Sequence, residues 1–172
     1  FAVAFSVENE DRWVAAAVEL GSPGISGKVS AHFLALEGTA TLAVTFSDAF
    51  IPEDDLLADD LRSFVKRVRA GFVLLQAGMA IGLIRNCISL MRALPEKTQE
   101  TNSYLPFGPD EVQERLCALE DDVFSLAKSP FEPSPDFVKK VLTARLDASE
   151  LSLASTQSLM LHAGARAYLS NS

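Results

Sequence analysis

The spacing of hydrophobic positions changes about one third of the way along the chain. In residues 1–7 the side chains of Phe1, Val3, Phe5 and Val7 alternate with smaller partners, and this period of two is typical of a strand. From about residue 60 the apolar side chains form longer runs with helical spacing. The pattern predicts an α+β protein, in which an antiparallel β segment precedes a helical bundle.

The β segment is expected to hold four strands that form a sheet or half a barrel, at residues 1–7, 13–20, 28–35 and 40–46. The polar stretch at residues 8–12 and the sequence Gly21-Ser22-Pro23-Gly24 have the composition of turns. The last expected strand lies in a stretch rich in β-branched residues, which suit a pleated surface.

Three helices are expected, at residues 60–94, 109–126 and 136 to about 162. Proline-marked loops at 95–108 and 128–135 separate them, because proline interrupts a helix interior. Three long helices with two such turns predict an antiparallel up-down-up arrangement. The resulting domain division is 1–58, an incomplete β domain, and 59–172, a helical bundle.

The stretch from residue 70 to 84 is the most apolar part of the chain, and Gln76 is its only polar side chain. A helix that is apolar almost all round is buried in a larger protein or spans a membrane. A membrane span needs about 20 residues, so these 15 residues before Arg85 are too few. We expect the central helix of a bundle, wrapped by other helices and by another subunit, and no transmembrane segment.

Charge and cysteine content narrow the class of protein. The net charge of −8 repels phosphate backbones and argues against a nucleic-acid partner. Cys87 and Cys117 lie in expected helices, and the chain has no CxxC motif. We therefore expect both to be reduced structural thiols of a cytoplasmic protein. The chain begins FAVAFSV without an initiator Met, so we expect a fragment, a processed product or a partial chain.

The residues alone give no catalytic machinery. The acidic clusters lack the ligand rhythm of a metal loop, so no metal is expected. The serines at 152–158 lie within a helix without a glycine elbow, unlike a hydrolase nucleophile. His162 is either a general base, since its ordinary pKa suits neutral pH, or a satisfied histidine at a helix end.

Three segments, in this order, carry a resemblance to a known family. They are LEGTATLAVTFSDAFIPEDDLL at 36–57, AGMAIGL at 77–83 and HAGARAY at 162–168. Their order and spacing resemble the acyl-CoA dehydrogenase family, in which the end of a middle β domain precedes a C-terminal helical bundle. The resemblance covers essentially the whole chain and implies that residues 1–58 are part of that β domain.

The resemblance implies a flavoprotein that binds FAD between the β domain and the bundle, with the glycine-rich turn supplied by a neighbouring subunit. Gly164, Ala165, Arg166 and Ala167 would lie along the dinucleotide, and Tyr168 would approach the flavin and substrate. Small residues let a backbone approach a cofactor closely. The alternative for this segment is a C-terminal helix cap that only packs.

The chain departs from the family at its catalytic base. The family places a carboxylate three residues after the turn's aromatic residue, and here that position is Asn171. Some branches carry the base on the central helix, where this chain offers Gln76 and Asn86. None of these amides can act as a base near neutral pH.

The chain also departs from the family at the FAD phosphate. The family arginine that precedes a Phe-Gly pair aligns with Tyr104. Arg69 and Arg85 could substitute for it, or serve as surface or capping residues. The family's N-terminal helical domain and the first half of its β domain have no counterpart in these residues.

Two hypotheses follow. The first is an FAD-dependent oxidoreductase acting on a small acyl substrate of the acyl-CoA class, by α,β-dehydrogenation or a related flavin reaction such as monooxygenation. The second is a non-catalytic oligomerisation or binding module on the same fold. Either one predicts a homodimer or homotetramer without membrane insertion, because sheet edges and an apolar helix face need cover.

Overall fold

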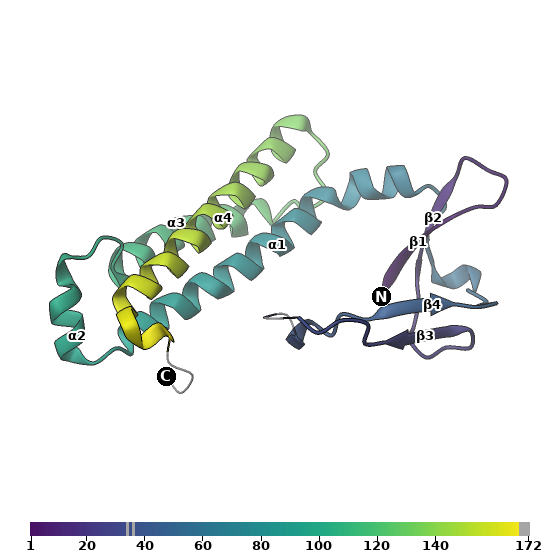
Figure 1. Ribbon diagram of the computed structural model, residues 1–172. Helices are drawn as coiled ribbons and strands as arrows, with labels where there is room; N and C mark the ends of the chain where they lie inside the picture. Colours follow the sequence, from purple (N-terminus) through teal and green to yellow (C-terminus); the bar gives the residue numbers. More distant parts are fainter. Residues whose placement is uncertain (34, 36, 169–172) are drawn as a thin grey trace. The chain divides into compact units, whose positions relative to one another are not determined.

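The computed structural model describes residues 1–33, 35 and 37–168. The chain divides into two compact units between Lys66 and Arg67. The first unit holds the strands, and the second holds the helical bundle (Figure 1). The predicted α+β class, with small antiparallel sheets and a bundle, is confirmed.

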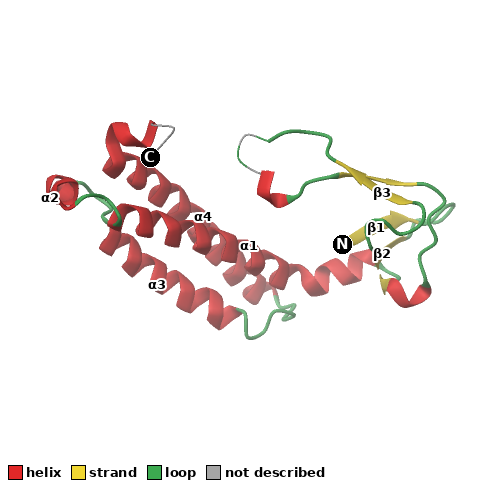
Figure 2. Cartoon of the chain, turned by 90° about the horizontal axis from the view of Figure 1, so that it is seen from below, coloured by secondary structure: helices red, strands yellow, loops and turns green. Residues whose placement is uncertain are grey.

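Five strands are described, and they form two antiparallel sheets (Figure 2). The first sheet has the order β1-β2-β5 and the second pairs β3 with β4. Their bounds are β1 Ala2–Ser6, β2 Trp13–Ala17, β3 Ile25–Lys28, β4 Ala43–Phe46 and β5 Leu56–Ala58.

A small apolar core holds the β unit together. Ala16, Val18 and Ile25 are buried in it. The rings of Phe5 and Phe46 meet edge to face with their centroids 5.5 Å apart, which is a favourable aromatic geometry. The two sheets therefore share one hydrophobic cluster, to which β1 and β4 both contribute.

Gly24 shows why the turn after β2 needs glycine. Its φ is +80°, and a Cβ there would lie 2.5 Å from the Ser47 carbonyl oxygen. The Gly24 carbonyl accepts a hydrogen bond from the Ser47 amide at 2.8 Å. Any side chain at this position would break the contact that aligns β3 with β4.

The third expected strand, at residues 28–35, is wrong. The strand lies earlier, at Ile25–Lys28, where Ile25 pairs with Phe46 and Lys28 with Ala43. Residues 29–33 form no strand, and residue 34 lies outside the described residues. Residues 29–33 alternate in hydrophobicity but have no strand to pair with. The shorter and less regular β3 does pair with β4. A single four-stranded sheet is accordingly wrong as well.

The helices agree more closely with the sequence pattern. Helix α1 spans Leu61–Arg92, α3 spans Pro109–Leu126 and α4 spans Pro135–Ala163. The connection at 95–108 is not a plain loop, because it contains α2 (Glu96–Thr101) and the 3-10 turn η3 (Asn102–Tyr104). Every residue of α2 is polar, so no hydrophobic periodicity marked it in the sequence.

Asp60 caps the start of α1. Its carboxylate accepts hydrogen bonds from the Ser63 hydroxyl at 2.6 Å and from the Arg62 amide at 3.0 Å. The hydrogen bond from Ser63 is the main reason that the pKa of Asp60 lies below its ordinary value. Such a cap satisfies a backbone donor that the first helical turn leaves open.

Side-chain contacts confirm the up-down-up order. Arg85 of α1 pairs with Glu120 of α3 at 2.8 Å, and Arg92 pairs with Asp110 at 2.9 Å. A later α1 residue thus meets an earlier α3 residue, so the two helices are antiparallel. In contrast, α1 and α4 run parallel, since Arg145 contacts Gln76 and Ser158 contacts Met91.

The core of the bundle is built from one face each of α1, α3 and α4. Its buried members are Ala70, Leu74, Ala77, Ile81, Ile84, Ile88, Met91, Val112, Leu116, Leu119, Val123, Val141, Ala144, Ala148 and Leu151. On the opposite side of α1, Leu75 is 74% and Met79 70% exposed. Among the described residues the other helices of this chain therefore cover only one side of α1, and the expected cover of the remaining side by another subunit stays a prediction.

By length and composition α1 is apolar enough to cross a membrane, although the sequence pattern predicted no such segment. One third (33%) of its most apolar window is buried inside the structure. The core helix of a soluble protein passes the same test, so α1 alone is a weak indication of a membrane span. A cytoplasmic location stays a prediction.

Candidate functional site

The candidate site lies at the end of the bundle where α1 and α4 finish and α3 begins. Here the connection between α1 and α3 holds α2, η3 and the segment 105–108. Figures 1 and 2 both show α2 at the same end of the helical unit as the C-terminal end of α4. The turn at 164–168, which the resemblance assigns to the cofactor, and the segment 104–108, which departs from the family's arginine-containing segment, therefore belong to one end of the bundle.

Two hydrogen bonds attach the connection to α4. The Ser158 hydroxyl donates to the Phe107 carbonyl oxygen at 2.6 Å. The Asn102 side-chain amide donates to the His162 carbonyl oxygen at 2.6 Å. Ser158 and His162 are four residues apart and share one face of the helix. The connection is thus fixed along the last turns of α4.

Phe107 is held in an unusual backbone conformation. Its φ is +61°, a region that a residue other than glycine rarely adopts. Its amide donates to the Glu111 carboxylate at 3.0 Å, and the Arg115 guanidinium lies 4.2 Å from the centre of its ring. Glu111 and Arg115 pair with each other at 2.8 Å. Strained residues of this kind tend to occur at ligand sites and switch regions.

The turn expected at the end of α4 forms the 3-10 segment η4 (Gly164–Tyr168). Gly164 ends the helix with φ +57° and donates its amide to the Met160 carbonyl. No atom lies within 4 Å of the place where its Cβ would be, so the backbone angle is what requires glycine. Ala165 and Arg166 are exposed, Ala167 is half-buried, and the Tyr168 ring is exposed.

His162 lacks one of the hydrogen bonds expected of a satisfied histidine, and its role as a general base stays a prediction. It is 7% exposed at the end of α4, and its Nε2 atom has no hydrogen-bond partner in the described protein. The expectation of a satisfied histidine is therefore wrong at this atom. A general base needs to reach its substrate, whereas this nitrogen is buried.

The expected positions for a catalytic base do not converge on the site. Gln76 accepts a hydrogen bond from Arg145 at 3.4 Å within the α1–α4 contact. Asn86 is exposed on α1, and Asn171 lies outside the described residues. No carboxylate stands at any of these positions.

The expected phosphate-binding side chains are also dispersed. Arg85 pairs with Glu120 on the side of the bundle where α1 meets α3. Arg69 is exposed near the start of α1. Tyr104, which takes the place of the family arginine, is 94% exposed in the connection. Of these three positions, only Tyr104 belongs to the same end as Gly164.

The other reactive side chains have structural partners or are buried. The hydroxyls of Ser152 and Ser155 donate to helix carbonyls at 2.8 and 2.6 Å, so neither is a free nucleophile. Cys87 and Cys117 are free thiols in α1 and α3. Burial raises the pKa of the Cys87 thiol, which lowers its reactivity. Among the residues described, no group of three His, Cys, Asp or Glu side chains could hold a metal ion.

An acidic groove of about 390 Å³ runs between α3 and α4 next to this end. Phe107 and Arg115 line it together with Asp122, Asp147 and Glu150. Three carboxylates repel phosphate groups.

Comparisons of the chain with family models, with curated proteins and with solved structures each gave no match. The resemblance to acyl-CoA dehydrogenases remains a prediction that rests on the quoted residues.

Sequence reasoning missed Asn102 and Ser158, which attach the connection to α4, and Glu111 and Arg115, which contact Phe107. The two contacts to α4 connect residues 60 and 51 positions apart. No local pattern marks such pairs.

Proposed function

We propose that the chain is part of an FAD-dependent oxidoreductase of the acyl-CoA dehydrogenase type. In this proposal the end of the bundle presents the Gly164–Tyr168 turn to the dinucleotide. The substrate is a small acyl compound of the acyl-CoA class, and the protein acts in the cytoplasm as a homodimer or homotetramer.

One observation carries the proposal. The turn that resemblance assigns to the cofactor directly follows the last turns of α4, where side-chain hydrogen bonds attach the connection between α1 and α3 at Asn102 and Phe107. Phe107 at the same end also has a positive φ, a conformation that costs a residue other than glycine about 1–3 kcal/mol and that tends to cluster at ligand sites. Gly164 adopts its positive φ without such strain.

The residues of the turn fit a dinucleotide. Gly164, Ala165 and Ala167 offer backbone with little side-chain cover, so a large flat ligand can approach closely. Arg166 is exposed and basic, and arginine pairs well with phosphate oxygens. FAD would supply hydride or oxygen chemistry, and this chain's residues would bind and orient it.

The missing carboxylate bears on the reaction. Gln76, Asn86 and Asn171 cannot remove an α-proton from an acyl-CoA. If the base is on no other part of the protein, the residues favour a related flavin reaction that needs no such base, such as monooxygenation. Otherwise the α,β-dehydrogenation of an acyl-CoA thioester applies.

The alternative function is a non-catalytic assembly module on the same fold. The observation in its favour is the apolar outward face of α1, with Phe72, Leu75 and Met79, and the matching exposure of Leu146 and Leu153 on α4. Exposed apolar patches of this extent mark interaction surfaces.

The test is a flavin titration of the full protein, followed by fluorescence and visible absorption. We expect FAD to bind, and Arg166→Ala to weaken binding by about tenfold or more, because it removes a charge-assisted hydrogen bond. Arg62→Ala, which removes an exposed arginine at the start of α1, is the matched control and should leave binding unchanged.

The outcomes separate the two functions. Absence of flavin binding, together with a stable oligomer, would overturn the flavoenzyme and support the assembly module. Binding that is equally weakened by Arg62→Ala would contradict the role of the turn.

A further inference from the structure

We infer that Asn102 is a positioning residue, whose side-chain amide fixes the end of α4 and thereby sets how the Gly164–Tyr168 turn is presented. The consequence for cofactor binding rests on the proposed function, whereas the structural coupling does not. Asn102 belongs to no segment that the family resemblance singles out.

The inference starts from the end of a helix. The last four carbonyl groups of an α-helix have no partner within the helix. In α4 the Asn102 amide supplies a donor to the His162 carbonyl at 2.6 Å in a partly buried setting. His162 precedes Gly164 by two residues, so this contact lies directly before the turn.

Asn102 is itself held firmly. It ends α2, where its backbone amide donates to the Glu100 and Thr98 carbonyls. Its own carbonyl accepts from the Leu105 amide at 2.9 Å. With the backbone bound on both sides, the side chain loses little further freedom when it reaches α4, which strengthens a single hydrogen bond.

A second contact makes the effect local. The Ser158 hydroxyl still attaches the connection to α4 through the Phe107 carbonyl when Asn102 is changed. The core residues of α3 and α4 do not involve Asn102. Loss of its amide should therefore loosen the turn without unfolding the bundle.

The chemistry requires a donor. Asn102→Asp has nearly the same shape, but an ionised carboxylate only accepts hydrogen bonds and would face the His162 carbonyl oxygen. Asn102→Gln keeps the amide on a side chain one methylene longer. The series Ala, Asp and Gln thus separates the donor from the volume of the side chain.

The first arm of the test is amide hydrogen exchange of the full protein without any ligand. Asn102→Ala and Asn102→Asp should speed exchange at residues 160–168 by about tenfold, the size expected for one lost hydrogen bond, and leave residues 112–123 unchanged. Asn102→Gln should restore at least part of the protection. Asn86→Ala, at an exposed asparagine of α1, is the matched control and should change neither region.

Unchanged exchange at 160–168 in Asn102→Ala, or equal acceleration at 112–123, would overturn the inference. The second arm measures FAD affinity in the same variants, which should fall in step with the exchange rates. If the wild-type protein binds no flavin, the proposed function fails, and the exchange arm still decides the role of Asn102.

Discussion

Helices α1 and α3 contribute to the same core but differ on their outward sides. The outward side of α3 carries charged residues such as Glu114 and Asp121, with Phe124 as its large exposed apolar residue. The outward side of α1 carries Phe72, Leu75 and Met79. Helix α1 has no acidic residue at all.

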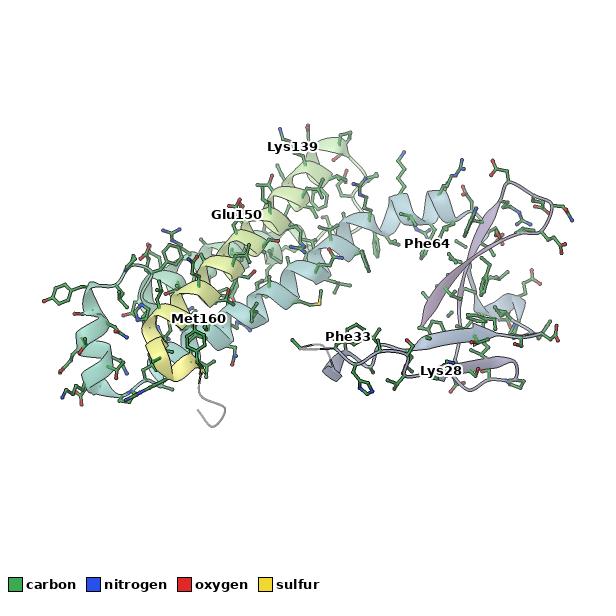
Figure 3. The ribbon with its side chains drawn as sticks, in the orientation of Figure 1. Lys28, Phe33, Phe64, Lys139, Glu150 and Met160 are labelled. Carbon is green, nitrogen blue, oxygen red and sulfur yellow. The ribbon has the colours of Figure 1, made fainter. Side chains whose placement is uncertain are left out.

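This difference shows that the outward side of α3 is suited to contact with water, whereas the outward side of α1 is not. Charged side chains along α3 are well solvated, whereas the exposed apolar residues of α1, and those of α4, gain stability when they are covered. Figure 3 shows Lys139, Glu150 and Met160 along α4. Met160 shares one side of α4 with Leu146 and Leu153, at a spacing of seven residues, and Lys139 lies on the same side at the start of the helix.

The largest expected effect is on stability. Leu116 of α3 is 1% exposed, whereas Leu75 of α1 is 74% exposed. Leu116→Ala should cost about 2–5 kcal/mol in the free energy of unfolding, because it leaves a cavity in the core. Leu75→Ala, compared with the wild type in the monomeric state at low protein concentration, should change it by about 0.5 kcal/mol or less. Urea unfolding measures both, and similar losses would contradict the assignment of the two faces.

The next effect is on assembly. Leu75→Glu places a charge on the outward face of α1, and a subunit contact there would have to bury it unpaired. We expect the molar mass from light scattering to fall from that of an oligomer to that of a monomer. Phe124→Glu on α3 is the matched control and should keep the oligomer. A monomeric wild-type protein would refute the prediction.

The smallest effect concerns the two thiols. Burial raises the pKa of Cys87 in α1, while Cys117 in α3 is exposed. Below the ordinary thiol pKa of about 8.5, both states hold the proton and the stability is unaffected. As the pH rises above it, the unfolded chain ionises first, so the folded state loses stability.

Urea midpoints at neutral and alkaline pH should therefore fall more in the wild type than in Cys87→Ala. Cys117→Ala should show the same fall of the urea midpoint between neutral and alkaline pH as the wild type, and it serves as the control. An equal fall of the urea midpoint in all three proteins would show that burial has no effect on the titration of the Cys87 thiol.

The sequence predicted the long helices well because their signals are local. Pro109 begins α3 at the expected residue, and the long apolar run predicted α1, although it did not show which side of that helix is buried. The strand β3 was misplaced, because the choice between residues 25–28 and 28–35 depends on pairing with β4. Helix α2 was missed because its polar residues have no buried face.

The candidate site was predicted only in its parts. The glycine at 164 and the small residues after it stand out in the sequence, and the structure gives Gly164 the positive φ that glycine allows. The contacts of Asn102 and Ser158 could not be predicted, since they depend on how α4 lies against the connection. The orphaned Nε2 atom of His162 likewise depends on the packing around it.

The up-down-up order of the helices affects the electrostatic field at the candidate site. Two helix C-termini, those of α1 and α4, meet one N-terminus, that of α3, at this end. Each C-terminus carries a partial negative charge of about one half, and each N-terminus a positive one. The backbone thus presents a net negative field here, so that a bound anion would depend on side chains such as Arg166 for its attraction.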